Sequence, residues 1–164
     1  MTATKSLHDL FVHLLKDVYY AEKQILKALP KMAKHADSAD LRQAFEHHRK
    51  ETEGQVERLE KVFDIIGVKA AGKTCPAIKG IIEEGEEDIK DAKDPDVRDA
   101  GMIADAQAVE HYEIARYGTM IAWAKQLGMN DAAALLQETL DQEYNADNIL
   151  TQLAEGALNR QAAA

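Results

Sequence analysis

Residues 107–118, Gln-Ala-Val-Glu-His-Tyr-Glu-Ile-Ala-Arg-Tyr-Gly, place two carboxylates among apolar side chains at helical spacing. The apolar face of this helix is marked by Ala106, Val109, Ile114, Tyr117 and Ile121. Glu110 lies inside that face, and Glu113 lies at its edge. A bare carboxylate in an apolar interior costs several kcal/mol, so Glu110 must be paired, protonated or bound to a cation.

Three other predicted helices repeat this feature near their midpoints. Glu22 lies on the apolar face of the first helix. His48 and Glu51, one turn apart, share a face of the second, and Glu143, with Asp147 one turn on, lies on the last. In a helical bundle, residues near the middle of each helix meet at one level, which predicts a cluster of carboxylates and one imidazole.

The elements that would carry these residues are helices throughout. Ala, Leu, Glu and Lys are abundant, Pro and Gly number only 3 and 9, and no alternating strand pattern occurs. Cap residues, prolines and glycines set the expected ends. The sequence predicts helices over about 7–35, 39–66, 76–91, 95–127 and 131–157, with Thr74 and Asn130 as caps of the third and fifth.

The lengths of the connections predict the topology. Short links make two antiparallel hairpins, 7–35 with 39–66 and 95–127 with 131–157. A connection of roughly 28 residues with a short helix of its own can cross the bundle from end to end. We therefore expect an all-α, ferritin-like four-helix bundle with a long crossover, formed by one domain over residues 1–164.

Such a cluster would be strongly repulsive when empty, and two divalent cations would neutralise most of its charge. Oxygen-rich ligation with one nitrogen suits iron or manganese, and zinc is an alternative. The predicted metal residues are Glu22, His48, Glu51, Glu110 and Glu143, with Glu113 and Asp147 less firmly assigned. As neighbours of the ligands, the sequence suggests His111, Gln55 and Tyr20.

The sequence departs from the usual di-metal pattern of two single Glu ligands and two Glu-x-x-His pairs. No Glu-x-x-His occurs, because residues 48–51 carry the reverse order and the last helix has no His. An alternative therefore stays open. The buried acids would then pair with Arg49, Lys50, Arg58 or Arg116 and hydrogen-bond to Tyr in a non-catalytic structural or protective bundle, with or without a structural metal.

Composition and charge limit the partners and the cellular location that we expect for this protein. The formal net charge of −9 argues against nucleic acids and anionic membranes as partners. Cys75 is the single cysteine, which fits a reducing cytosol. The N-terminal residues 1–10 contain Asp9 where a secretory apolar segment would lie, so we expect a cytoplasmic protein.

Four segments of the chain resemble the YciE/YciF-type ferritin-like proteins. They are L-K-D-V-Y-Y-A-E-K-Q-I-L-K-A-L-P-K-M (15–32), H-R-K-E-T-E-G-Q-V-E-R-L-E (48–60), G-K-T-C-P-A-I-K-G (72–80) and Q-A-V-E-H-Y-E-I-A-R-Y-G-T (107–119). The resemblance implies a bacterial, cytoplasmic, dimeric bundle linked to stress responses. It implies no established activity. It places the family's metal residues on the same positions, Glu22, His48, Glu51, Glu110 and Glu143.

These observations lead to three hypotheses. In the first, two iron ions between the helices react with dioxygen or peroxide, giving a ferroxidase-like oxidoreductase. In the second, the bundle is structural and its acids are paired internally. In the third, zinc or manganese binds for structure alone, and the sequence does not separate this from the first.

Overall fold

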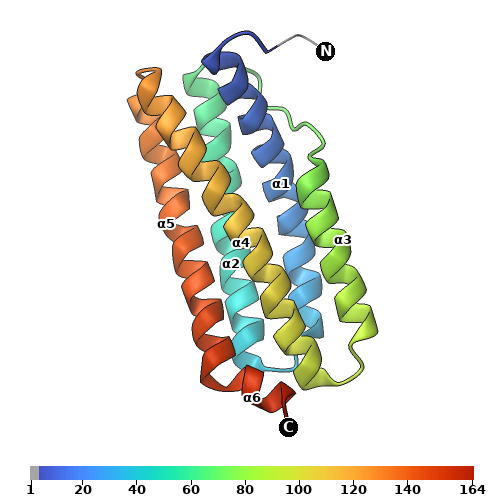
Figure 1. Ribbon diagram of the computed structural model, residues 1–164. Helices are drawn as coiled ribbons and strands as arrows, with labels where there is room; N and C mark the ends of the chain where they lie inside the picture. The colour runs from blue at the N-terminus through green and yellow to red at the C-terminus, as the bar shows by residue number, and fades with distance from the viewer. Residues whose placement is uncertain (1–3) are drawn as a thin grey trace.

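A computed structural model describes residues 4–164 of the chain, so the first three residues of the N-terminal segment discussed above lie outside it. Every regular element in this range is helical (Figure 1). The elements are α1 (Leu7–His35), α2 (Ala39–Ile65), α3 (Pro76–Asp91), α4 (Pro95–Gln126), α5 (Asn130–Leu153), a π-helix over Ala154–Leu158 and a final turn, α6 (Asn159–Ala162). The all-α prediction is confirmed.

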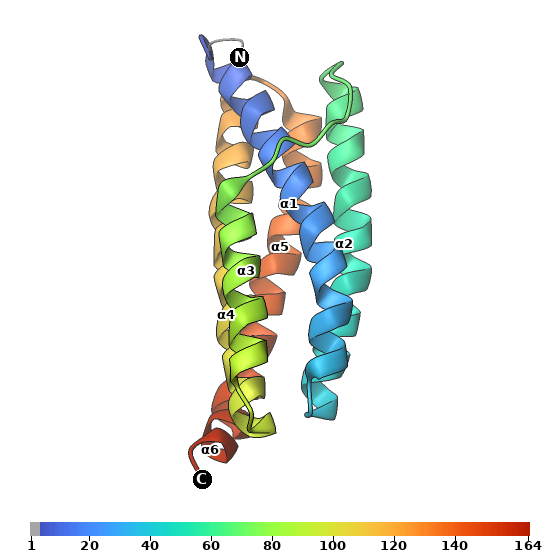
Figure 2. The same ribbon diagram turned by 90° about the vertical axis from the view of Figure 1, so that its right-hand side faces the viewer.

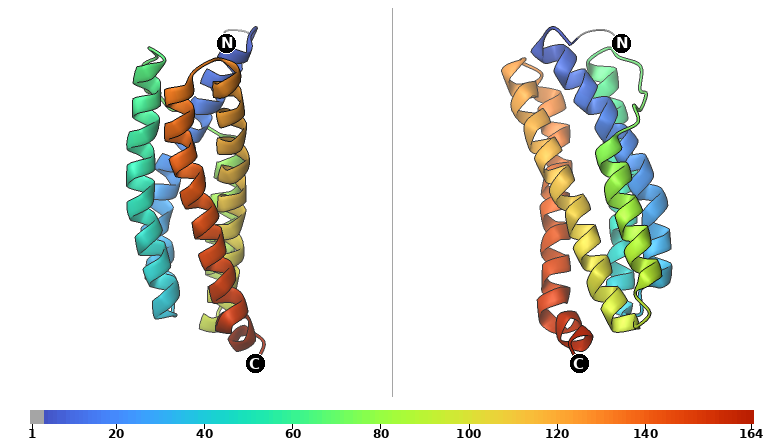
Figure 3. Two further views of the ribbon diagram at one scale, coloured as in Figure 1. Left: turned by 90° about the vertical axis from the view of Figure 1, so that its left-hand side faces the viewer. Right: turned by 45° about the vertical axis from the view of Figure 1, so that its right-hand side comes forward.

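The four long helices form a closed ring in the order α1, α2, α5, α4, with each helix packed on its two neighbours. Every neighbouring pair in this ring runs antiparallel, as the views in Figures 1 and 3 show. After α2 the chain crosses the outside of α1, where the backbone N–H of Lys73 donates to the carbonyl of Lys16 over 3.1 Å (Figure 2). Helix α3 then lies on the outside of α1 and α4 and returns the chain to the opposite end. This is the predicted ferritin-like bundle with its helix-containing crossover.

The helix ends follow the local signals in the sequence. Ser6 and Ser38 accept hydrogen bonds from the backbone N–H groups of Asp9 and Leu41, over 3.0 and 3.3 Å, and so cap α1 and α2. Two glycines, Gly67 and Gly128, follow α2 and α4 with φ of 68° and 74°. This left-handed conformation favours glycine and ends both helices.

Three details of the sequence prediction are wrong. The helix expected over 131–157 ends at Leu153 and continues as a π-helix, whose wider turn leaves no signal in apolar periodicity. Asn130 is the first residue of α5 rather than its cap, and the cap position, Met129, makes no side-chain bond. Cys75, not Thr74, caps α3, and the proline that follows it removes one N–H that would need a partner.

The apolar core consists of two separate clusters, one in each half of the bundle. The upper cluster includes Phe11, Leu15, Leu59, Phe63 and Leu136. The lower cluster includes Ile25, Leu41, Phe45, Met102 and Leu150. Between them along every long helix lies a layer of polar side chains, and this polar layer holds the predicted site residues.

Asp99 fixes the turn between α1 and α2 from the neighbouring helix α4. It is 1% exposed, and its two carboxylate oxygens accept hydrogen bonds from the backbone N–H groups of Asp37 and Ser38, over 2.9 and 2.7 Å. Asp99→Asn would place an amide donor against one of these donors. We expect a loss of about 1–3 kcal/mol in the free energy of unfolding, measured by chemical denaturation. The exposed substitution Asp64→Asn should change it little, and equal effects of the two variants would contradict this role for Asp99.

Candidate metal centre

The polar layer is built from the middle of each long helix. Glu22 comes from α1, His48 from α2, Glu110 and Glu113 from α4, and Glu143 from α5. All five are buried, with exposed fractions of 0%, 6%, 2%, 0% and 0% in that order. Helical periodicity fixes this placement, because each residue lies on the same face as the apolar residues one or two turns away.

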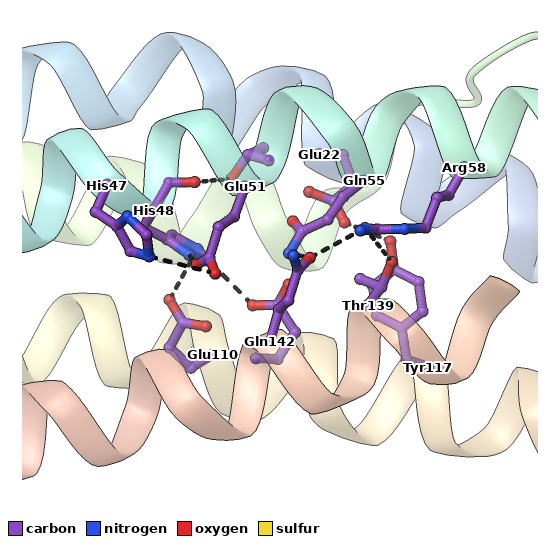
Figure 4. A network of polar contacts seen from close by, with 12 residues as sticks. Glu22, His47, His48, Glu51, Gln55, Arg58, Glu110, Tyr117, Thr139 and Gln142 are labelled. Carbon is purple, nitrogen blue, oxygen red and sulfur yellow. Dashed lines mark hydrogen bonds and ion pairs between the residues drawn. The ribbon is translucent and has the colours of Figure 1, made fainter.

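Four of these side chains converge on one point. One ligand atom each from His48, Glu110, Glu113 and Glu143 lies within 4.8 Å of the other three. His48 Nε2 is 3.2 Å from Glu110 Oε1 and 3.7 Å from Glu143 Oε2. Figure 4 shows His48 above Glu110, between α2 and the facing helices. Three carboxylates and one imidazole therefore surround a common centre.

Glu22 adjoins this group and is held by Tyr117. The Tyr117 hydroxyl donates a short hydrogen bond to Glu22 Oε1, across from α4 to α1. Tyr117 is itself fully buried and lies in the upper core cluster. Tyr117 lies on the predicted apolar face, and the spacing of residues along α4 does not show that its hydroxyl reaches Glu22 in particular.

With the acids ionised, most of the potential metal-binding atoms of the cluster have no hydrogen-bond partner. Seven are buried and unpartnered in that state: Glu22 Oε2, His48 Nε2, Glu110 Oε2, and both carboxylate oxygens of Glu113 and of Glu143. When protonated, Glu110 bonds with Glu143 and Glu113 bonds with Glu22. Buried polar groups in proteins are nearly always satisfied, so such a concentration in one place indicates a missing ligand.

The bases proposed as internal partners of these acids lie elsewhere. Arg49 pairs with Glu53, Arg58 pairs with Glu138, and the Arg116 guanidinium lies over the ring of Tyr112. Among residues 4–164, no Lys or Arg forms an ion pair with Glu22, Glu110, Glu113 or Glu143. The expected pairing with Arg or Lys is therefore absent from this range, whereas the hydrogen bond to Tyr expected under the structural alternative is present between Tyr117 and Glu22.

Burial and mutual repulsion hold protons on Glu22, Glu110 and Glu113. Loss of hydration, together with the charge of Glu143, raises the pKa of Glu22 to about 8. Loss of hydration and the hydrogen bond with Glu143 raise the pKa of Glu110 well above the usual value for Glu. Loss of hydration and the charge of Glu22 do the same for the pKa of Glu113. A carboxyl group in this environment is neutral near pH 7 unless a cation replaces its proton.

His48 is a base surrounded by acids. Burial alone would lower the pKa of His48, but the hydrogen bond with Glu51 and the charge of Glu143 outweigh it and raise the pKa. Glu51 lies 3.5 Å from His48 Nδ1 and 3.4 Å, through its other oxygen, from Nε2 of the exposed His47 (Figure 4). Glu51 therefore lies between the buried cluster and the surface rather than inside the group of four.

The structure places Asp147 and His111 away from the cluster. His111 Nε2 is 3.2 Å from Asp147 Oδ2, and Gln107 donates to the other Asp147 oxygen over 3.1 Å. The His111 side chain is 68% exposed. His111 follows Glu110 directly, and one residue along a helix rotates a side chain by about 100°, which turns His111 toward the surface.

Gln55 and Tyr20 also differ from the expectation. Gln55 is fully buried, but its amide donates to Gln142 over 3.2 Å rather than to a site residue. Tyr20 packs on the lower cluster beside the crossover, where a Cβ at Gly72 would lie 3.2 Å from its own. No hydrogen bond within residues 4–164 joins Tyr20 to the cluster.

The charge and chemistry of the cluster fit bound metal. Its four carboxylates would carry four negative charges when ionised, and the neutral imidazole adds a nitrogen ligand. Carboxylate-rich sites with one or two imidazoles suit iron and manganese. The unpartnered atoms supply the donors, so the residues present fit this group.

The fold and this arrangement can now be compared with known proteins. A family model described as a domain of unknown function, DUF892, matches residues 6–163. The chain belongs to the DUF892 family. It is 46% identical over 159 residues to the protein YciF of Escherichia coli K12, covering 96% of each chain. This confirms the resemblance seen in the sequence.

Solved structures agree with the DUF892 assignment. The crystal structure of the E. coli stress protein YciF matches with a TM-score of 0.91 at 46% identity, over 95% of this chain and 99% of that one. YcfI of Rhodopseudomonas palustris, described as a candidate structural protein, matches with a TM-score of 0.90 at 48% identity, over 92% and 96%. A Xanthomonas campestris protein at 22% identity, with a TM-score of 0.70 over 92% of both chains, shares the fold. In the part of the chain described, no helix has the length and apolar character needed to cross a membrane.

Proposed function

We propose that the chain binds two divalent metal ions, with iron as the best match, inside the polar layer and uses them in a stress-related oxidation reaction. The observation that carries this proposal is the set of seven buried, unpartnered donor atoms on five side chains. Apolar side chains at these positions would stabilise the bundle better than buried polar groups without partners. Burial of such groups costs free energy, which the binding of a cation would offset.

Each residue has a part that follows from its position. His48, Glu110, Glu113 and Glu143 would supply the ligands nearest the common centre. Glu22 would supply a carboxylate from α1, oriented by the hydroxyl of Tyr117. Glu51, bonded to His48 Nδ1, would fix the ring so that Nε2 faces the centre.

The proposed chemistry is the oxidation of Fe(II). Two bound Fe(II) ions would supply the two electrons that, with two protons, reduce dioxygen to hydrogen peroxide or hydrogen peroxide to two waters. The E. coli relative described as a stress protein supports a role under stress. The homodimer and the cytoplasmic location implied by the resemblance stay part of this proposal, and the native mass in solution tests the former.

Metal content tests the proposal directly. Untagged protein is loaded anaerobically with Fe(II), desalted and measured by elemental mass spectrometry, and we expect about two irons per chain. Stopped-flow mixing with dioxygen or peroxide then tests the reaction, with metal-free protein as the control. Absence of retained metal in folded protein would overturn the whole proposal. Retained metal with no oxidation would leave a structural metal site.

A structural role is the second candidate, and the description of the R. palustris relative favours it. Under this reading the bundle protects or scaffolds without turnover. The two readings differ in one measurable respect, because a structural bundle has no need to react with an oxidant. Fe(II) oxidation by the loaded protein that is much faster than oxidation of the same Fe(II) in buffer alone would therefore decide against the structural reading.

Tyr117→Phe tests the contact with Glu22. The variant keeps the ring in the upper core and removes only the hydroxyl that donates to Glu22. Because groups that orient ligands contribute strongly to metal binding, we expect metal affinity to fall roughly 10- to 100-fold, measured by competition with a chelator. Tyr144→Phe is the matched control, since Tyr144 is 56% exposed on α5. Equal affinity in the two variants would contradict the assigned role of Tyr117.

A further inference from the structure

A narrow apolar pocket reaches the candidate metal centre from beneath α3. It lies between α1, α3 and α4 and has a cavity volume of about 50 Å³. His48 and Glu110, both buried members of the cluster, form part of its lining, and exposed Lys31 and Glu86 lie at its rim. The pocket therefore extends from the surface to the centre.

The wall between rim and centre is largely aliphatic. Its side chains include Ile25 and Leu29 from α1, Ile82 and Ile89 from α3, and Val109 from α4. Asp105 of α4 also lines the pocket, and its buried Oδ2 has no hydrogen-bond partner. At the rim, Lys31 Nζ lies 2.8 Å from Glu86 Oε1, so the two charges there neutralise each other.

Helix α3 forms the outer wall of this pocket. It lies outside the closed ring of the four long helices. Gly85 of α3 lies so close to Asp105 of α4 that an added Cβ would be 3.3 Å from the Asp105 Cβ. The absence of a side chain at Gly85 lets α3 lie close to α4, so that its isoleucines face the pocket rather than solvent. The crossover helix thus covers one side of the cluster with an apolar wall.

We propose that the pocket beneath α3 binds a neutral, apolar molecule of diatomic size and delivers dioxygen to the candidate metal centre. The volume is too small for benzene, which a dry apolar cavity of about 150 Å³ admits, and an apolar wall of this kind favours a gas over water. Delivery of dioxygen rests on the proposed function. Binding of an apolar gas does not.

The test uses xenon, a probe that binds dry apolar cavities, on the metal-free full-length protein. Crystals under xenon pressure should show one xenon atom beneath α3 in contact with Ile82 and Val109. Ala28→Phe, which places a ring at the pocket lining, should abolish this site, whereas Ala122→Phe on the exposed side of α4 should retain it. Ala28→Leu is a milder variant with the same expected direction should the phenylalanine disturb folding.

The outcomes separate the two proposals. A pocket that holds no xenon, or only ordered water, overturns the gas site and leaves the metal centre untouched. If xenon binds, the Fe(II)-loaded Ala28→Phe protein should retain its iron and react with dioxygen at least about tenfold more slowly than Ala122→Phe. An unchanged rate with dioxygen would overturn delivery through this pocket. Loss of iron binding in wild-type protein would instead overturn the proposed function.

Discussion

Glu110→Ala should lower the affinity for Fe(II) by at least about 100-fold. Loss of a group that only orients a ligand lowers metal affinity by about 10- to 100-fold, and this variant removes a ligand itself. Glu110 lies on α4 at the common centre, 3.2 Å from His48 Nε2, and its second oxygen has no partner. The measurement is anaerobic titration with Fe(II) in competition with a chelator, followed by elemental analysis after desalting.

Two companion variants make this result interpretable. His111→Ala changes the next residue on the same helix, whose side chain is 68% exposed and bonded to Asp147, and should bind metal normally. Glu110→Gln keeps the shape of the neutral side chain and cannot ionise, so the metal-free variant should be at least as stable as the wild type. Normal metal binding by a folded Glu110→Ala protein would contradict our assignment of this ligand.

The stability of the metal-free protein should fall as pH rises from about 5 to 8. Glu22 has its pKa raised to about 8 in the folded state, from 4.5 in a free chain. Between these values the folded protein binds a proton that the unfolded chain has lost, so the free energy of unfolding decreases with pH. The slope is about 1.4 kcal/mol per pH unit for each such proton. The raised pKa values of Glu110 and Glu113 act in the same direction.

Metal should reverse this dependence, because its ligands bind only when deprotonated. Denaturation curves across this pH range, with and without metal, measure both slopes. Glu22→Gln should flatten the metal-free slope, whereas Glu57→Gln, at an exposed position of α2, should leave it unchanged. A metal-free protein whose stability rises over this range would show that the acids are ionised and internally paired.

The sequence was sufficient to predict the bundle because residues typical of helix ends stand at most of its helix boundaries. Ser6, Ser38 and the Asp94-Pro95 pair mark three beginnings, and Gly67 and Gly128 mark two ends, each through a local backbone preference. Only the last turn of the fifth predicted helix differs in type, since the π-helix over 154–158 changes the hydrogen-bonding pattern while the apolar residues continue. Periodicity reports which face is buried and not which carbonyl each N–H reaches.

The candidate site was predicted in part, for a physical reason. Glu22, His48, Glu110 and Glu143 were found because each interrupts an apolar face. Glu113 was placed at the edge of its face, but it is fully buried, since the bundle encloses α4 over a wider arc than one stripe. Contacts between helices, such as that of Tyr117 with Glu22, depend on side-chain direction across the bundle, which spacing along one helix does not contain.

The two apolar clusters on either side of the polar layer have a consequence for cooperativity. Each half of the bundle has its own core, and small cores alone give marginal stability. The plane that joins them consists of acids without partners, so in the metal-free protein it is the weakest contact between two partly independent folding units. Cations bound in that plane would link the halves through ligands from all four long helices. Metal supply would then determine whether the chain unfolds in one transition or in two.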